Sequence, residues 1–355
     1  MMEQMTDILS RFDLPGKVIS CLPYGNGHIN DTFRILCERE KAESSSFILQ
    51  RINRNVFHHP DQVMENITGI ISWLTGKYKE AGRDVTREVL CLVPEESGRG
   101  YTIDDSGEYW RVYRFIENAV CYEQAESEES FRQSALAFGS FQRLLSDYPA
   151  RTLHETIPDF HNTPVRFEQF TSAVERDPVG RYSSCRWEAD FLLGMEKLAH
   201  RLYDAHKVGK LPLRVTHNDT KLNNVMMDVK TGKALCILDL DTVMPGFSVT
   251  DFGDAIRFGA NTAREDEPDL KRVGFDRHLY EVYREGYLEG CEGSLTREEE
   301  ALLPDGAEVI TCEQALRFLT DYLEGDVYYK TAYPEHNLIR ARTQIRLLDQ
   351  MLAIL

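Results

Sequence analysis

The sequence predicts an α+β protein in which a small lobe built on an antiparallel sheet is followed by a larger, mainly helical lobe. Runs with alternating apolar and polar residues occur in the first part of the chain, whereas later apolar residues recur at helical spacing. Between two apolar runs of strand length stands the segment HNDTKLNN, His217 to Asn224, which concentrates polar and charged side chains. We place the first lobe at residues 1–118 and the second at residues 119–355.

Composition excludes several classes of partner. The chain of 355 residues carries a formal net charge of −17, which argues against nucleic acid and anionic membranes because both require a basic surface. No two of its eight cysteines form a CxxC pair, so we expect reduced thiols and a cytoplasmic protein. The acidic, amphipathic start MMEQMTDILSRFDL does not resemble a signal peptide, and no apolar run reaches membrane-spanning length. Nothing indicates an obligate protein partner.

A glycine-containing turn near the start of the chain is the first candidate for nucleotide binding. Predicted strands at Val18–Pro23 and from residue 33 to 37 flank the turn that holds Gly25, Asn26 and Gly27. Glycines let the backbone approach a nucleotide closely, and the backbone N–H groups of such a loop can face phosphate. A plain hairpin turn is the alternative interpretation of the same pattern.

The predicted third strand, Phe47–Ile52, carries one amide and one basic side chain near its end. Protein kinases carry a phosphate-binding lysine on this strand, and this chain has none. Register places Gln50 at that position, while the available cation, Arg51, lies one residue further and points to the other face. Which of the two contacts phosphate is open. The role of Glu65, on the helix predicted from Pro60, is open as well because its lysine partner is missing.

The last strand of the first lobe is predicted at Tyr109–Asn118, and it leads into the connection between the lobes. We expect backbone groups near Phe115 to Glu117 to meet the edge of the adenine ring. His161, in a rigid loop of the second lobe, is expected to be a hydrogen-bonding residue of the loop and not a catalyst. The helices predicted for the second lobe are Ser130–Leu145, Arg186–Leu202, Gln314–Lys330 and Asn337–Ile354.

The segment HNDTKLNN matches the catalytic loop of a phosphotransferase, in which an Asp serves as base and an Asn as metal ligand. Asp219 can accept the proton of an attacking hydroxyl, and Lys221 can neutralise charge on the moving phosphoryl group. Asn224 and Asp239 offer the hard oxygen ligands that Mg²⁺ prefers. Asp239 directly follows a second apolar run of strand length. His217 is expected to hold the loop, and a solvated hairpin turn is the alternative to this whole interpretation.

A second aspartate segment, Asp251-Phe252-Gly253, spells the metal-binding DFG of protein kinases. We reject it as the first metal site because a turn, not an apolar strand, precedes it. The better interpretation is that Asp251 caps a helix beginning near Phe252. Asp241 is either a second metal ligand or a hydrogen-bond acceptor in the outer shell of the metal site, and the sequence leaves both roles open.

The segments HNDTKLNN, LDLDTVMPG and DFGDAIR together resemble the aminoglycoside phosphotransferase and choline kinase superfamily, and within it most closely the N-acetylhexosamine 1-kinases. The resemblance extends from Tyr24 to about Tyr333. It implies a two-lobed protein-kinase-like fold, ATP and Mg²⁺ as cofactors, and phosphoryl transfer to the anomeric hydroxyl of GlcNAc or GalNAc. The sugar is then the small-molecule partner. The preferred epimer, the oligomeric state and the pathway are not indicated.

The late helix predicted at Gln314–Lys330 carries the candidate acceptor-binding residues. Arg317 and Tyr328 are about three helical turns apart, so they are expected to share a face. In the N-acetylhexosamine kinases that the chain resembles, a late-helix Arg and Tyr at this spacing contact the sugar. With Asp219 and Asp239, they form the predicted acceptor site.

Two alternatives remain beside the sugar kinase. A kinase of the same fold acting on choline, an aminoglycoside or another small alcohol would need an acidic acceptor pocket, which Arg317 disfavours. A non-catalytic binding protein with a kinase-like fold would explain the missing third-strand lysine. The presence of Asp219, Asn224 and Asp239 argues against that last interpretation.

Overall fold

The computed structural model describes residues 2–25, 29–38 and 44–355. The chain separates into two compact units, and each is described by itself. The first comprises Met1–Val120, Arg151–Pro158 and Met226–Met244, and the second comprises Cys121–Ala150, Asp159–Val225 and Pro245–Leu355. The first unit therefore includes two short segments from the later part of the chain, beside the region predicted as residues 1–118.

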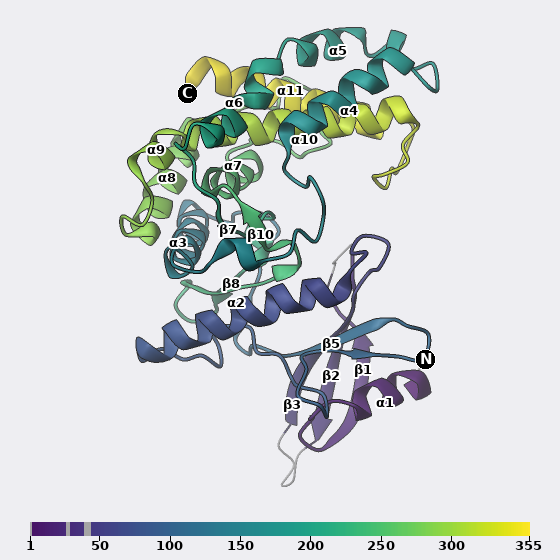
Figure 1. The fold of residues 1–355 in the computed structure, drawn as a ribbon, viewed down its shortest axis with the longest axis vertical. Coiled ribbons are helices and arrows are strands. Elements are labelled where there is room, and N and C mark those ends of the chain that lie inside the picture. The colour runs from purple at the N-terminus through teal and green to yellow at the C-terminus, as the bar shows by residue number, and fades with distance from the viewer. Residues whose placement is uncertain (1, 26–28, 39–43) are drawn as a thin grey trace. The chain divides into compact units, whose positions relative to one another are not determined.

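The first unit is built on an antiparallel sheet of five strands in the order β1-β2-β3-β5-β4 (Figure 1). The α+β class with an antiparallel sheet in the first lobe is thus confirmed. The bounds are β1 Lys17–Pro23, β2 Asp31–Glu38, β3 Ser44–Arg51, β4 Thr102–Ile103 and β5 Tyr109–Arg114. A further sheet has the order β6-β8-β9, with β6 Ala119–Val120, β8 Val225–Asp228 and β9 Ala234–Ile237.

The two faces of the five-stranded sheet differ in character because successive strand residues point to opposite sides. One face packs against helix α1, Met2–Ser10, and forms an apolar core (Figure 1). The other face carries a cross-strand row of polar side chains, Thr32, Gln50 and Arg111. The core on the first face includes Ile8, Leu9, Phe12, Ile35, Cys37, Phe47, Leu49, Trp110 and Val112.

Helix α2, Pro60–Glu80, begins with a proline, whose missing N–H would have no helical partner at this position. Its buried residues include Val63, Met64, Ile67, Ile70 and Leu74, the spacing of one helical face. It packs against the short 3₁₀ helix η4, Leu240–Thr242, within the same unit. The buried Asn66 side chain donates to the carbonyl oxygens of His154 and Val243, so α2 fixes two chain segments that enter this unit late in the sequence.

The second unit is mainly helical, as predicted, and α10 packs against α7, α11, α4 and α6 (Figure 1). Its two short strands, β7 Arg214–Thr216 and β10 Met244–Gly246, pair with each other. The helices are α3 Glu128–Leu144, α4 Thr163–Arg176, α5 Arg186–Leu193, α6 Glu196–Lys207, α7 Ser248–Gly259, α8 Arg277–Cys291, α9 Arg297–Ala301, α10 Leu303–Glu324 and α11 His336–Ile354. The remaining 3₁₀ helices are η1 Ala150–Thr152, η2 Tyr182–Ser184 and η3 Leu222–Asn224.

A close approach of two helix backbones fixes α7 against α10. A Cβ atom added to Gly253 would lie 2.3 Å from the carbonyl oxygen of Gly306, and one added to Gly306 would lie 2.1 Å from that of Val249. Only glycines allow this separation. The glycine of the Asp251-Phe252-Gly253 segment thus serves helix packing, which holds the first turns of α7 in place.

Two predicted helices differ from the structure. The single helix predicted at Arg186–Leu202 is divided into α5 and α6 around Gly194. The helix predicted at Gln314–Lys330 begins earlier, at Leu303, and ends at Glu324, because Gly325 adopts a left-handed conformation with φ +98° and terminates it. Tyr328 therefore does not lie on this helix, and the prediction that it shares a helical face with Arg317 was wrong.

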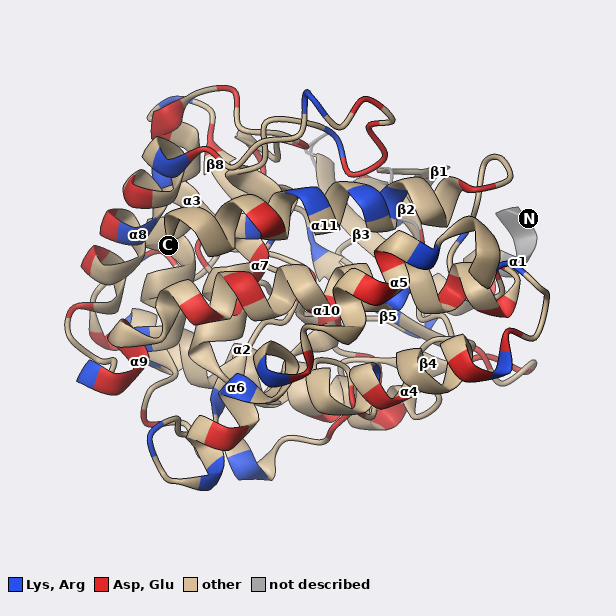
Figure 2. Ribbon diagram, turned by 90° about the horizontal axis from the view of Figure 1, so that it is seen from above, with Lys and Arg blue, Asp and Glu red and all other residues tan. Residues whose placement is uncertain are grey.

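Among the residues that the structure describes, no helix combines the length and apolar character needed to cross a bilayer. In the view of Figure 2, acidic and basic residues are interspersed along α5 and α8.

Candidate active site

The first turn of α7 accepts hydrogen bonds from the loop that follows β7 and so stabilises it. The Asp251 carboxylate accepts hydrogen bonds from the backbone N–H groups of His217 and Asn218, both at 2.8 Å, and from the side chain of Gln142 at 3.0 Å. Asn218 has a left-handed backbone with φ +65°, unusual for a residue other than glycine. Asp251 thus stabilises a strained turn immediately before Asp219.

Asp251 does not cap the helix, so that prediction was wrong. Helix α7 begins at Ser248, and Asp251 is already inside its first turn. Burial raises the pKa of Asp251, while the two backbone N–H groups of the loop favour its charged form. Its neighbour one turn later, Asp254, accepts from the backbone N–H of Thr220 at 3.1 Å.

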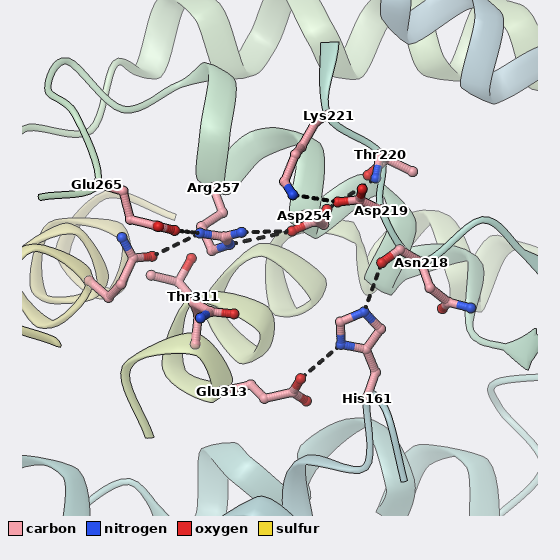
Figure 3. Close-up of polar contacts among 12 residues, drawn as sticks. His161, Asn218, Asp219, Thr220, Lys221, Asp254, Arg257, Glu265, Thr311 and Glu313 are labelled. Carbon is pink, nitrogen blue, oxygen red and sulfur yellow. Dashed lines mark hydrogen bonds and ion pairs between the residues drawn. The ribbon is translucent and has the colours of Figure 1, made fainter. Parts of the chain in front are cut away.

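Asp219, Lys221 and Asn224 are brought together by this loop (Figure 3 shows the first two). Lys221 Nζ lies 2.8 Å from Asp219 Oδ1, and Asn224 Nδ2 donates to Asp219 Oδ2 at 3.0 Å. Burial alone would raise the pKa of Asp219, but the charge and hydrogen bond of Lys221 outweigh it, and the pKa lies below its ordinary value. Asp219 is therefore ionised at neutral pH and able to accept a proton.

Asn224 is oriented for a role as an oxygen ligand. Its Nδ2 also donates to the backbone carbonyl of Asp219 at 2.8 Å, so the amide nitrogen faces Asp219 and the amide oxygen is turned away from it. Asp239, which belongs to the other unit, follows β9 in a left-handed conformation with φ +54°. The Asp239 carboxylate and the Asn224 amide oxygen are each, taken alone, of the type that Mg²⁺ prefers, since Mg²⁺ is usually held by one or two protein oxygens together with water and substrate phosphates. In the described parts of the chain, no cluster of three or more His, Cys, Asp or Glu side chains forms a metal site by itself.

His217 is fully buried, and the rings of Phe138 and Phe141 on α3 meet it edge-on at 5.4 and 6.0 Å. Its Nδ1 lies 3.3 Å from the backbone nitrogen of Asp219. The second turn of α7 adds a further anchor, because Arg257 pairs with Asp254 at 3.1 Å (Figure 3). The loop that presents Asp219 is thus fixed by buried groups on both sides.

His161 links this loop to α10 (Figure 3). One ring nitrogen lies 3.2 Å from the carbonyl oxygen of Asn218, and the other lies 2.8 Å from Glu313, which also accepts from Thr163 at 2.6 Å. Burial by itself lowers the pKa of His161. The charge and hydrogen bond of the Glu313 carboxylate have the larger combined effect, so the pKa lies above its ordinary value. The pKa of Glu313 is lowered, because its partners, above all His161, outweigh its burial.

Arg317 lies one turn after Glu313 on α10, surrounded by aromatic rings. Its guanidinium carbon is 5.4 Å from the centre of the Phe160 ring, 5.9 Å from that of Tyr328 and 5.7 Å from that of Tyr329. Arg317 and Tyr328 do come together, although by a chain reversal instead of a common helix. That reversal is held by the Asp321 carboxylate.

Asp321 is buried and accepts the backbone N–H groups of three consecutive residues after the helix, Val327, Tyr328 and Tyr329, at 2.7–3.0 Å. The side chain of Asn337 on α11 donates to the same carboxylate at 2.8 Å. Sequence periodicity gave no signal for this arrangement. An aspartate in the last turn of a helix, four residues before a glycine, would have been the feature to notice.

Arg166 on α4 adds a second guanidinium to this part of the unit. Its Nη atoms donate to Gln169 and to the carbonyl of Phe160, and among the described residues its buried Nε has no hydrogen-bond partner. Burial and the positive charge of Arg317 both lower the pKa of Arg166. Arg166 was not predicted from the sequence, because an isolated Arg in a helical pattern resembles any exposed Arg.

In the first unit, the predicted nucleotide-binding residues lie at several places. Gly25 has φ +76°, as a tight turn requires, while Asn26 and Gly27 lie outside the described residues. Phe115 meets the Tyr24 ring edge-on at 5.8 Å. It also lies beneath the Arg34 guanidinium, with 4.2 Å from the guanidinium carbon to the ring centre. Glu117 lies 3.7 Å from the same arginine.

Gln50 and Arg51 are on opposite faces of β3, as register predicts. Arg51 is paired with Asp31, whereas Gln50 contacts Thr32 and Arg111. Glu65 is partnered by His154 at 2.7 Å and not by a cation of the sheet. Asp241 is buried, and it pairs with Arg111 and accepts from Asn30.

The comparison with known proteins gives the family. The sequence model of a family described as "Phosphotransferase enzyme family" matches residues 20–289. The chain belongs to this family. Three similar solved structures are a microcompartment-associated aminopropanol kinase, an amicoumacin kinase in complex with AMP-PNP, Ca²⁺ and Ami, and a choline kinase from Cryptosporidium parvum.

These structures are 17%, 14% and 12% identical to the phosphotransferase in sequence, with TM-scores of 0.63, 0.58 and 0.55. The alignments cover 99%, 99% and 95% of this chain and 98%, 94% and 90% of the other chains. At such identity the likeness shows the fold, and it confirms the two-lobed kinase-like architecture over nearly the whole chain.

The contact between Lys221 and Asp219 predicts a change in the pH dependence of the phosphotransferase. In the variant Lys221→Met, the positive charge that lowers the pKa of Asp219 is gone, while its burial remains. The pKa of Asp219 should rise, so the acidic limb of the kcat/KM profile should move to higher pH. Lys207→Met, which removes an exposed lysine 3.0 Å from Asp204, is the control and should leave the limb in place. An unmoved limb in Lys221→Met would contradict the account of Asp219.

Proposed function

We propose that this phosphotransferase is an ATP-dependent kinase that phosphorylates the anomeric hydroxyl of an N-acetylhexosamine, giving the sugar 1-phosphate. The observation that carries the proposal is the charge around Arg317. His161, Arg166 and Arg317 lie near Glu313, and His161 joins this cluster to the residue preceding Asp219.

The donor side is supported by the family and by the residue types of the loop. The similar amicoumacin kinase was solved with an ATP analogue and a divalent cation. Asn224 and Asp239 would hold Mg²⁺ in this chain. When bound, Mg²⁺ would offset the negative charge of the phosphates. The glycine turn at Gly25 and the segment Phe115–Glu117 are proposed to contact the phosphates and adenine.

The chemistry at the acceptor is assigned to Asp219 and Lys221. As the anomeric oxygen forms its bond to the γ-phosphorus, its proton passes to the Asp219 carboxylate, and the bond between the γ-phosphorus and the ADP oxygen breaks. The lowered pKa of Asp219 keeps its carboxylate ionised before transfer, so that it has a site for this proton. Lys221 would place its ammonium group next to the transferring phosphoryl group.

The cluster favours a neutral, oxygen-rich acceptor. Glu313, the carboxylate of the cluster, is already engaged by His161 and Thr163, and the raised pKa of His161 favours its positive form. An ammonium group would meet two guanidinium groups, which repel it. An acetamide carbonyl and sugar hydroxyls accept hydrogen bonds from guanidinium groups, and the aromatic rings around Arg317 suit a sugar ring. GlcNAc and GalNAc both present these groups.

The variant Arg317→Ala tests this assignment. We expect the KM for the sugar to rise about 10- to 150-fold, the equivalent of a lost charge-assisted hydrogen bond of roughly 1.5–3 kcal/mol, with little change in the KM for ATP. GlcNAc and GalNAc should weaken together, because the proposed contact is common to them. The matched control is Arg176→Ala, which removes an exposed arginine 2.8 Å from the Glu324 carboxylate.

A purely structural role for Arg317 makes a different prediction. It would lower the melting temperature and leave the sugar KM of the folded enzyme unchanged. Measuring both quantities on one preparation distinguishes the two roles, and an unchanged sugar KM would remove Arg317 from the acceptor site.

A further inference from the structure

Among the residues of the first unit that the structure describes, the most deeply buried arginine lies beside the position where a kinase lysine is missing. Arg111, on β5, is only 1% exposed, and it is directly opposite Gln50 on the neighbouring strand. Side chains that face each other across antiparallel strands have Cβ atoms about 4.5–5.5 Å apart. A long arginine on β5 can therefore place its charged end in the region that a side chain at position 50 would occupy.

The contacts of Arg111 confirm that its charged end lies there. Its Nε and Nη2 donate to Gln50 Oε1 at 3.0 and 2.8 Å, and Gln50 Nε2 donates in turn to Thr32 Oγ1 at 3.1 Å. Gln50 is thus fixed as a neutral support for the guanidinium. A lysine at position 50 would lie against Arg111 and repel it, which accounts for the glutamine here.

The other end of the guanidinium meets the segment that follows β9. Arg111 Nη1 lies 2.6 Å from Asp241 Oδ1, and Asn30 Nδ2 donates to Asp241 Oδ2 at 2.7 Å. The charge of Asp239, two residues earlier, also acts on Arg111. Arg111 is therefore paired with Asp241 in this segment, and the charge of Asp239, proposed as a metal ligand, favours its charged form.

A buried ion pair of this kind is costly to form, because both charges lose their hydration, and apolar residues of similar size often stabilise a fold equally well. Stability alone therefore does not account for Arg111. A nucleotide site requires a cation, however, since the phosphates would otherwise approach Asp239 and Asp241 without compensation. Arg51, the neighbouring alternative, is on the opposite face and paired with Asp31.

We propose that Arg111 is the cation of the nucleotide site, doing from β5 what a third-strand lysine does in protein kinases: it holds the Asp239–Asp241 segment and compensates the phosphate charge. The inference rests on the proposed use of ATP as donor. It is independent of which acceptor the enzyme phosphorylates.

The test is nucleotide binding to Arg111→Gln, measured by calorimetry with Mg·ATP, Mg·ADP and adenosine. We expect Mg·ATP and Mg·ADP to bind about 10- to 150-fold more weakly, the effect of a lost charge-assisted contact, and adenosine to bind as in the wild type. Arg99→Gln, an exposed arginine paired with Glu95 in the same unit, is the control and should not change binding. Arg51→Gln should have a much smaller effect than Arg111→Gln.

The double variant Gln50→Lys/Arg111→Gln returns the cation to the third strand and exchanges the two side chains. We expect it to recover at least tenfold of the lost Mg·ATP affinity, which a residue needed only for packing would not do. If Arg111→Gln does not fold, Arg111→Lys and the double variant are measured instead, and both should bind Mg·ATP within about tenfold of the wild type, because each keeps one cation in this row.

Unchanged Mg·ATP binding in folded Arg111→Gln would overturn the inference, as would a loss equal for adenosine, a larger effect of Arg51→Gln, or a double variant without recovery. Each of these results leaves the proposed function intact. Wild-type protein that does not bind Mg·ATP would instead overturn the proposed function, and this inference with it.

Discussion

The variant Asp219→Asn should bind Mg·ATP nearly as well as the wild type and transfer phosphate about 10²–10⁴-fold more slowly, as expected when a general base is lost. Asparagine keeps the shape of the side chain, but it cannot accept the proton of the acceptor hydroxyl. The measurements are calorimetry with Mg·ATP and the rate of ADP release with sugar.

The chain offers a matched control for this variant. Asp204 is an exposed carboxylate 3.0 Å from Lys207, a pair that resembles Asp219 and Lys221 chemically but lies on α6. Asp204→Asn should leave both binding and turnover unchanged. Near-normal turnover in Asp219→Asn would exclude Asp219 as the base.

The variants Asp239→Ala and Asp251→Ala should lose different properties, namely nucleotide binding in the first and stability in the second. Asp239→Ala should lose Mg²⁺-dependent nucleotide binding and keep its fold, since Asp239 is proposed as a metal ligand. Asp251→Ala should lose stability, because the buried N–H groups of His217 and Asn218 would have no acceptor. Leaving two such groups unsatisfied costs roughly 2–6 kcal/mol, since each costs about 1–3 kcal/mol.

Denaturant unfolding and Mg·ATP calorimetry on both variants separate these effects. The account expects a lower free energy of unfolding for Asp251→Ala and weaker Mg·ATP binding for Asp239→Ala. If folded Asp251→Ala alone lost the nucleotide, the metal ligand would be Asp251, and the choice between the two aspartates would be wrong.

Features carried by short stretches of sequence were predictable. The strands around Gly25, the third strand and the run before Asp239 each follow from local alternation or apolar length, and the structure contains them. The contact among Asp219, Lys221 and Asn224 follows from a loop of eight residues. Such features depend on neighbours in the sequence, so one chain is enough to find them.

Features that depend on distant segments were not predictable. Arg111 and Asp241 are far apart in the sequence, and their pairing depends on how the segment after β9 returns to the sheet. Tyr328 was assigned to a helix because its apolar neighbours continued the periodicity. The left-handed Gly325 and the acceptor role of Asp321 ended that helix.

The charge of the acceptor cluster illustrates the same limit. Arg317 was identified from the resemblance, whereas Arg166 on α4 and the His161–Glu313 contact come from two other segments of the second unit. Their combination, which distinguishes an oxygen-rich acceptor from a cationic one, depends on how α4, α10 and the connecting loop pack.

The most direct measurement is ADP release from Mg·ATP with free GlcNAc and GalNAc, with their methyl glycosides, and with choline and aminopropanol, followed by ³¹P NMR of the product. The account predicts ADP release with a free N-acetylhexosamine, none with the methyl glycosides, and a product whose phosphorus couples to the anomeric proton. Turnover of a methyl glycoside would contradict transfer to the anomeric hydroxyl. Faster turnover of choline or aminopropanol than of either sugar would contradict the assigned acceptor class.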